Sequence, residues 1–449
     1  MKKHSIKKGM TYPKIVALGF FILIAVGTIL LMIPAASRQP GSVGFNDAVF
    51  TATSASCVTG LVVVDTYTNW TLFGQIVILC LIQIGGLGFL TILAMFSMLF
   101  HRKIGLKERS LLQESVNTMY IGGIVRLIKK ILIGTFAIEF IGAAALSTRF
   151  IPKMGIGIGI YNSIFTSISA FCNAGFDLMG RYKPYSSLMM FRDDIVVNIT
   201  VILLILIGGI GFFVWDDITV NKHHFTRYKL HTKLVLIATA VLVVFGTAQF
   251  YIFESGTVLE DLRVHHKITA SAFMAVTPRT AGYNTVDLPL MTSAGKMLTI
   301  IFMFIGGNPG STSGGIKTTT TIIFILSVWS SLRNNNEINV MKRRLESDAL
   351  KRAAAVVTIN ITLIIISQLL ICAAQPELDL TDVTFEVFSA IDTCGMTMGI
   401  TRELNTFSRY VIIFLMFCGR VGSLSFALLF TEQKSPNMVQ NPVEKINIG

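Results

Sequence analysis

The stretch Cys57-Val58-Thr59-Gly60-Leu61 decides the fold, because its surroundings recur three more times along the chain. An apolar run of bilayer-spanning length precedes it, a short segment of mixed polarity leads into it, and a second apolar run follows it. The same order surrounds three further stretches, which are Cys172-Asn173-Ala174-Gly175-Phe176, Arg279-Thr280-Ala281-Gly282-Tyr283 and Asp392-Thr393-Cys394-Gly395-Met396. The central glycines lie 115, 107 and 113 residues apart. This repetition predicts an all-α integral membrane protein with four tandem helix–pore-helix–helix repeats, hence eight transmembrane helices, in pseudo-four-fold symmetry around a central pore.

The composition also indicates a membrane protein. Of the 449 residues, 52% are hydrophobic and 14% charged, and the mean hydropathy is +0.66, which is too apolar for an ordinary soluble protein. The net charge is +13, but 24 of the 38 Lys and Arg residues cluster on alternate connections between the expected spans. By the positive-inside rule this places both termini in the cytoplasm. The basic charge is therefore explained by membrane orientation, and nucleic-acid binding is not expected.

The chain divides into four repeats and a tail. The repeats are residues 1–100 with a cytoplasmic N-terminus, 101–215, 216–330 with an intramembrane loop at 306–317, and 331–430, followed by a cytoplasmic C-terminal tail at 431–449. The first spans are expected at residues 15–33, 127–146, 233–253 and 353–373, and the second spans at 71–100, 194–215, 294–329 and 409–430. Re-entrant pore helices are expected at residues 46–56, 161–171, 265–276 and 381–391, the first capped by Asn46 or Asp47.

The glycine turns lie at membrane depth, where free backbone groups must be buried or line water. Four turns around one axis satisfy that condition by forming a pore, and their carbonyls replace the hydration shell of a cation such as K⁺. Glycine allows backbone conformations that a Cβ would forbid, and the absence of charge beside it argues against carboxylate ligands. The predicted ion-selectivity filter, with K⁺ at its backbone carbonyls, consists of Val58, Thr59, Gly60, Asn173, Ala174, Gly175, Thr280, Ala281, Gly282, Thr393, Cys394 and Gly395.

A second glycine-rich set follows each turn by 24 to 33 residues. In repeats 1 and 2, Gly85-Gly86-Leu87-Gly88 and Gly208-Gly209-Ile210-Gly211 are explained by close helix packing. In repeat 3 the stretch at 306–317 cannot form a regular helix, so we expect a flexible polar break in mid-membrane.

Two charged residues stand out within the apolar runs. Arg420 has about ten apolar residues on each side, so we expect it to face a partner or a water-filled path and not to snorkel to the interface. Glu139 lies in the first span of repeat 2, where we expect a structural hydrogen bond and not an ion ligand. The six cysteines form no CxxC pair and have no zinc-spaced histidine, so they are interpreted as small buried residues.

These features resemble the Trk/Ktr/HKT superfamily of potassium transporters, and most closely the membrane subunit of Ktr systems. The resemblance extends over residues 15–430 and rests on the four turns, the repeat 3 loop and the repeat 4 arginine. It implies that Gly60, Gly175, Gly282 and Gly395 lie in the selectivity filter, and that a Gly in place of Ser at the first position favours K⁺. It also implies a gate beneath the filter, made by Gly306, Gly307, Asn308, Pro309, Gly310, Ser311, Thr312, Ser313, Gly314, Gly315, Lys317 and Arg420.

The same resemblance implies several partners. It predicts a homodimer with one pore per protomer, embedded in the lipids of a bacterial cell membrane. It further predicts a cytosolic ring of RCK-type nucleotide-binding regulatory subunits, for which this chain has no regulatory domain of its own. Na⁺ is a candidate activator, and no organic cofactor is expected.

The sequence thus favours the membrane subunit of a potassium uptake system with channel-like translocation. The alternative is a secondary carrier that moves another small cation or a solute by alternating access. That mechanism is typical of inverted repeats with a charged midplane site, whereas these repeats are parallel. A membrane enzyme would need a motif such as HExxH or clustered Asp and His in the spans, and the sequence has none. Whether K⁺ moves passively or with Na⁺ stays open.

Overall fold

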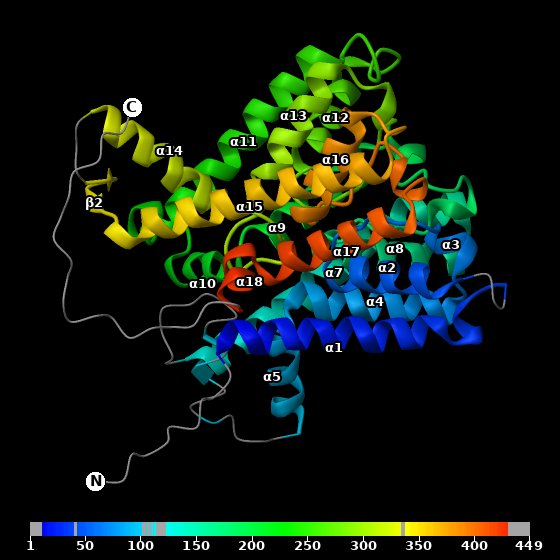
Figure 1. The fold of residues 1–449 in the computed structure, drawn as a ribbon, viewed down its shortest axis with the longest axis horizontal. Helices are drawn as coiled ribbons and strands as arrows, with labels where there is room; N and C mark the ends of the chain where they lie inside the picture. Colours follow the sequence, from blue (N-terminus) through cyan, green and yellow to red (C-terminus); the bar gives the residue numbers. More distant parts are fainter. Residues whose placement is uncertain are drawn as a thin grey trace.

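A computed structural model describes residues 11–39, 43–100, 105, 109–110, 112–113, 123–333 and 337–429 (Figure 1). The predicted cytoplasmic ends, residues 1–10 and the tail at 431–449, lie outside the described residues. The regular structure of the described part is helical apart from a short antiparallel pair, β1 (Asn339–Val340) with β2 (Arg343–Arg344). Single helical turns complete the connections: α3 (Thr66–Asn69), η1 (Pro34–Ala36), η2 (Met179–Arg181), η3 (Met189–Phe191), η4 (Phe225–Arg227), η5 (Leu288–Leu290) and η6 (Ile400–Arg402).

Four described helices are long and apolar enough to cross a membrane as single rods. They are α1 (Tyr12–Met32), α7 (Ile124–Met154), α11 (Leu230–Glu254) and α15 (Ser347–Ala374). Each contains most or all of one of the predicted first spans. The helices extend beyond the predictions because basic and polar residues at their ends, which hydropathy excludes from a span, are helical too.

Each long helix is followed by a shorter one that lies inside the molecule. These are α2 (Phe45–Ser56), α8 (Ile156–Phe171), α12 (Val264–Val276) and α16 (Leu380–Ile391). They match the predicted pore helices to within a residue, except that α8 begins five residues early. Small and hydroxyl-bearing residues allow this burial; in α2 every residue from Thr51 to Ser56 is buried.

The predicted cap of the first pore helix is wrong. The N-cap of α2 is Gly44, and no side chain bonds to the free amides there. Asp47 instead accepts from Nη1 of Arg409 at 2.9 Å, and Asn46 accepts from the hydroxyl of Tyr410 at 2.8 Å. The two side chains therefore attach the first pore helix to α17 (Thr406–Val421), at the opposite end of the sequence.

The second helices are broken, and the expectation of continuous second spans in repeats 1, 2 and 4 is corrected. The breaks separate α4 (Leu72–Leu87) from α5 (Phe89–Leu99), α9 (Ile195–Gly209) from α10 (Phe212–Asn221), α13 (Ser293–Phe304) from α14 (Thr318–Leu332), and α17 from α18 (Ser423–Leu429). The first two pairs bend by 97° and 94°. Figure 1 shows α5 turning away from α4. The causes are Gly88, Gly211 and Gly422, whose φ values of 84°, 101° and 93° end a right-handed helix.

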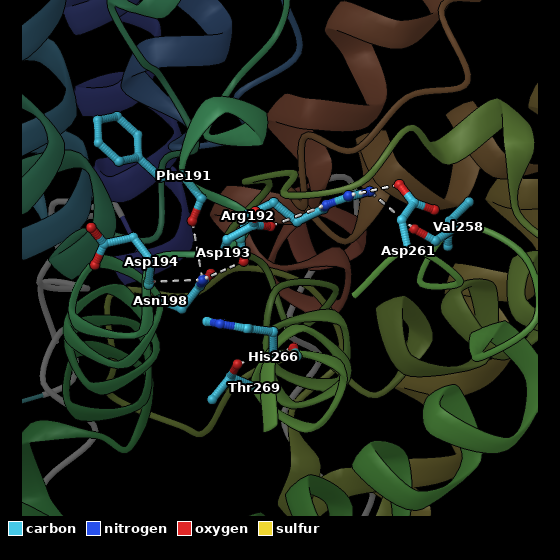
Figure 2. A network of polar contacts seen from close by, with 9 residues as sticks. All are labelled: Phe191, Arg192, Asp193, Asp194, Asn198, Val258, Asp261, His266 and Thr269. Carbon is cyan, nitrogen blue, oxygen red and sulfur yellow. Dashed lines mark hydrogen bonds and ion pairs between the residues drawn. The ribbon is translucent and has the colours of Figure 1, made fainter. Parts of the chain in front are cut away.

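Polar contacts join the connections of repeats 2 and 3 (Figure 2). Arg192 donates to Asp261 Oδ2 at 3.1 Å and to the carbonyl of Val258 at 3.3 Å. The amide of Asn198 donates to the carbonyls of Phe191, Arg192 and Asp194 within 3.2 Å, which fixes the start of α9. These bonds fix the loop that follows the second glycine turn against its neighbour.

Candidate functional site

The four turn glycines form a closed ring. A Cβ built on any one of them would lie within 2.7 Å of a backbone carbonyl oxygen in the next repeat. The contacts run in one direction: Gly60 meets Ala174, Gly175 meets Ala281, Gly282 meets Cys394, and Gly395 meets Thr59. The structure thus brings all four predicted turns together. No side chain other than hydrogen fits between adjacent turns.

A second feature of the turns was not anticipated from the sequence. The residue two positions before each glycine also has a positive φ, with values of 50° for Val58, 58° for Asn173, 74° for Thr280 and 50° for Thr393. The glycines follow with values from 68° to 92°. A positive φ is an outlier for β-branched residues such as Val and Thr, so the surrounding structure must impose it. Side-chain preference gives no signal for it.

Hydrogen bonds to the pore helices hold these turns. The amide of Thr59 donates to the carbonyl of Ser54 at 2.8 Å, and that of Gly60 to the Ser54 hydroxyl at 3.0 Å. In repeat 4 the amides of Cys394 and Gly395 bond to Ser389 in the same way, at 2.8 and 3.0 Å. The turn amides therefore point back into the protein. The amides are thus not available as ligands, and oxygen-based selection of a cation would depend on the carbonyls.

A cavity of about 160 Å³ lies against the ring, and all four glycines line it. Three carboxylates line it as well, from Asp65, Asp177 and Asp287. Asp65 is held by the amides of Tyr67 and Thr68 and by that of Tyr185. Withdrawal from solvent raises the pKa of Asp177 to about 7, and the charge of Asp65 adds to the effect. Negative charge at the mouth of the ring favours cations.

Sequence comparisons agree with this geometry. The family model described as TrkH, "Cation transport protein", matches residues 2–441. The match covers nearly the whole chain. The chain belongs to the TrkH family. Its relatives are cation transporters and not enzymes, which confirms the expectation of a non-enzymatic membrane protein.

Individual relatives support the same assignment. The chain is 41% identical over 431 residues to the Ktr system potassium uptake protein B of Bacillus subtilis, covering 95% of both sequences. It is 39% identical to the potassium/sodium uptake protein NtpJ of Enterococcus hirae, covering 100% of this chain and 99% of that one. The fold matches the potassium transporter TrkH of Vibrio parahaemolyticus with a TM-score of 0.75 at 17% identity, over 96% of this chain and 87% of that chain. The resemblance inferred from the sequence is confirmed.

In this TrkH-family chain, the irregular segment at 306–317 joins α13 to α14, as expected from its composition. It contacts the second repeat at both the turn and the helix break. The side-chain amide of Asn173 donates to Ser313 Oγ at 2.9 Å and Thr312 Oγ1 at 3.2 Å. The Thr312 hydroxyl donates to the carbonyl of Phe171 at 3.1 Å. The backbone amide of Asn308 donates to the carbonyl of Gly209. The predicted gate residues therefore pack directly beneath the predicted filter.

Arg420 reaches this segment from α17. Its guanidinium donates to the carbonyls of Thr312 and Gly85, and to that of Gly86 at 3.0 Å. No carboxylate pairs with it among the described residues. The side chain thus faces protein partners, as predicted, and keeps its charge uncompensated. With Gly310, Ser311 and other residues it lines a cavity of about 280 Å³ on the far side of the ring.

One residue of this site was missed from the sequence. Asp392, at the start of the fourth turn, is fully buried and accepts from the amide of Ile316 at 3.2 Å through Oδ1. Its Oδ2 has no partner among the described residues. Lys317 donates to the carbonyls of Ser313 and Gly314 at 2.7 and 2.9 Å, which closes the loop on itself. The sequence did contain a signal for this residue, because repeats 1 and 2 have a cysteine at the position where repeat 4 has the charged Asp392.

The second glycine set has two roles where one was predicted. Gly85, Gly208 and Gly419 lie against the carbonyls of Ser56, Phe171 and Ile391, the last residues of three pore helices, so the predicted close packing is confirmed. The helix breaks at 88, 211 and 422 are the additional role.

Glu139 accepts from the side-chain amide of Gln83 at 3.0 Å, in agreement with the predicted structural hydrogen bond.

Proposed function

We propose that this protein is the membrane subunit of a potassium uptake system in the bacterial cell membrane, and that K⁺ moves through the ring of glycine turns. The observation that carries the proposal is the closed cycle in which each glycine abuts a carbonyl of the next repeat. In this proposal eight spans surround the ring with pseudo-four-fold symmetry, both termini are cytoplasmic, and one chain makes a complete pore.

Selectivity follows from the backbone. Carbonyl oxygens of Val58, Thr59 and Gly60, with their counterparts in the other three repeats, replace the water around K⁺. Two facts support this role. The turn amides of repeats 1 and 4 are bonded to the pore helices, and each turn has two positive φ values separated by one residue, which is the kind of alternation that can aim successive carbonyls to one side. The carboxylates of the outer cavity raise the local concentration of cations before they lose their water.

The loop at 306–317 and Arg420 act as the gate in this proposal. A cation that leaves the ring meets a loop bonded to repeat 2 and a guanidinium without a carboxylate partner among the described residues. Two unit charges 4 Å apart repel each other by about 4 kcal/mol at an effective dielectric constant near 20. Glycine and serine let the loop adopt other conformations, so a partner that binds one conformation better shifts the population.

Three assembly features complete the proposal. The named potassium uptake relatives of the Ktr type support a multi-component system, with a cytosolic ring of RCK-type nucleotide-binding subunits as the regulator. The membrane subunit forms a homodimer in which each protomer has its own pore. Na⁺ is proposed as an activator, because the relative from Enterococcus hirae is named for potassium and sodium uptake.

The decisive experiment is ⁸⁶Rb⁺ uptake into liposomes that contain the purified protein, with and without a Na⁺ gradient. We expect saturable uptake that K⁺ competes for and that Li⁺ does not. Channel-like flux should continue without Na⁺ and increase when Na⁺ is added. A carrier with alternating access would instead show strict coupling to a second ion, and such coupling would reject the channel-like mechanism.

A further inference from the structure

An apolar groove lies on the outside of the molecule between α7 and the broken helix α9–α10. Its volume is about 740 Å³, which is large enough for a drug-sized ligand or a lipid chain. Ile133 and Ala137 form one wall, and Ile207 and Ile210 form the other. The groove opens sideways from the bundle, because Ile133 and Ala137 are exposed. Lipid is the solvent that such a wall meets.

Basic side chains surround one end of this groove. Arg126, Lys129 and Lys130 lie on the first two turns of α7 and all line it. Lys130 is neutralised by Asp216, with 2.8 Å between Nζ and Oδ1. Arg126 and Lys129 are exposed, and neither has an ion-pair partner among the described residues. Within the described part of the chain, two positive charges without an ion-pair partner therefore stand at the mouth of an apolar groove.

The basic residues place that mouth at the cytoplasmic membrane interface, where lysine and arginine concentrate. Trp215 lines the groove deeper in the protein, and its indole N–H donates to the carbonyl of Ile207 at 3.1 Å. The order along the groove, with basic residues first and aliphatic residues after them, matches the order of a phospholipid from phosphate to acyl chain.

We propose that the groove binds one anionic phospholipid, with the phosphate between Arg126 and Lys129 and an acyl chain along Ile133, Ala137 and Ile207. Free phosphate would leave the apolar walls unused, and a zwitterionic lipid would add a cation beside the two basic side chains. An anionic headgroup satisfies both halves of the site. Basic pockets between transmembrane helices recognise such headgroups in general.

The groove shares a wall with the proposed gate. Phe212, which lines it, donates its amide to the carbonyl of Gly310 at 2.7 Å. The ring of Trp215 lies 5.8 Å from that of Phe171, the last residue of the second pore helix. A lipid in the groove therefore packs against the residues that hold one end of the loop. This contact distinguishes a specific site from the general lipid belt.

The test is native mass spectrometry of the full-length protein in detergent, titrated separately with phosphatidylglycerol and phosphatidylcholine of identical acyl chains. We expect the parent to retain phosphatidylglycerol preferentially. R126Q/K129Q should lose about tenfold in phosphatidylglycerol affinity, since each basic residue near the headgroup contributes severalfold. K14Q/K351Q removes two exposed lysines outside the groove and should behave like the parent. A137W fills the groove without changing charge and should reduce retention of both lipids.

Each other outcome overturns the proposal. Equal retention of the two lipids by the parent would mean that the basic end does not select a headgroup. An equal loss of phosphatidylglycerol affinity in R126Q/K129Q and K14Q/K351Q would mean that only the net charge of the protein matters. Full retention by A137W would place the lipid elsewhere, and adducts formed with inorganic phosphate alone would remove the role of the acyl chain. Protection of the groove by a second copy of the chain would assign it to an interface. None of these readouts requires the protein to transport K⁺.

Discussion

The ring of glycine turns and the region below it are built on opposite plans. At the ring, all four repeats supply the same backbone conformation, a positive φ followed two residues later by a glycine with positive φ. Below the ring, the four second helices break in different ways. Two bend at a glycine by more than 90°, one is interrupted by a long loop, and one carries Arg420 two residues before its break. The difference suits the roles proposed above, because coordination of one ion needs four equivalent contributions, whereas a gate needs one part that can move against the rest.

The largest effect is expected from breaking the equivalence of the ring. In Gly395→Ala, the new Cβ meets the carbonyl of Thr59, and the φ of 91° is one that residues with a side chain rarely adopt. The left-handed region alone costs about 1 to 2 kcal/mol. We expect ⁸⁶Rb⁺ uptake to fall by about a hundredfold or more. Gly157→Ala is the matched control, because its Cβ enters open space on α8, and it should transport like the parent. Normal uptake by the Gly395 variant would exclude the ring from the ion path.

The next effect comes from removing the asymmetry below the ring. Arg420→Ala deletes the uncompensated charge and the bond to Thr312, and the glycines stay intact. Lowering a barrier by about 1.4 kcal/mol increases the rate tenfold. We therefore expect uptake to rise at least about tenfold, with unchanged K⁺ preference. Deleting part of residues 308–313 should act in the same direction. Arg333→Ala, on an exposed arginine, serves as the control. Flux no higher than the parent's, in variants that fold and reach the membrane, would make the loop and Arg420 structural.

A smaller effect on flux should distinguish Asn173 from Val58, which occupy the same position in the turns of repeats 2 and 1. Asn173→Ala removes two hydrogen bonds to the loop, each of which contributes about 1 kcal/mol. We expect severalfold higher basal flux and weaker dependence on a cytosolic regulator. Val58→Thr changes the equivalent residue of repeat 1 to the type found in repeats 3 and 4, and should leave gating unchanged. If both variants gate alike, the contact between Asn173 and the loop does not hold the closed state.

The smallest effect concerns pH at the outer mouth. The pKa of Asp177 is raised to about 7, so this carboxyl is ionised above pH 7 and becomes neutral as the pH falls through that value. Loss of the negative charge weakens cation attraction. We expect the apparent affinity for Rb⁺ to fall about two- to threefold between pH 8 and pH 6. Asp177→Asn should have the lower affinity at both pH values. A pH dependence that survives in this variant would assign it to another group.

How far the sequence predicts this molecule differs between the same two regions. The pore helices were located to within a residue in three repeats, because a hydroxyl-rich segment between two apolar runs is too short to span the bilayer and too polar to face lipid. The convergence of the glycines followed from repetition alone. In contrast, the bends at Gly88 and Gly211 were missed, since a glycine in an apolar run is equally compatible with close helix packing.

Long-range pairing explains the remaining misses. Asn46 and Asp47 had the composition and position of helix caps, but they bind Tyr410 and Arg409 across more than 360 residues of sequence. Asp392 appeared as one residue of a turn, and only the folded chain brings the amide of Ile316 to it. Local chemistry predicts what a residue can bind. The choice among available partners is made by the tertiary structure.

The direction in which the ring closes has a consequence for biosynthesis. The contact between Gly395 and Thr59 joins the last turn to the first, and Asp47 and Arg409 pair across the same seam. Ribosomes add about 5 to 20 residues per second, so the first turn waits roughly 20 to 70 s for its final neighbour. During that interval the first turn lacks the contact that Gly395 later makes with the carbonyl of Thr59. A nascent chain cut short before the fourth repeat therefore cannot close the seam, because both Gly395 and Arg409 are missing.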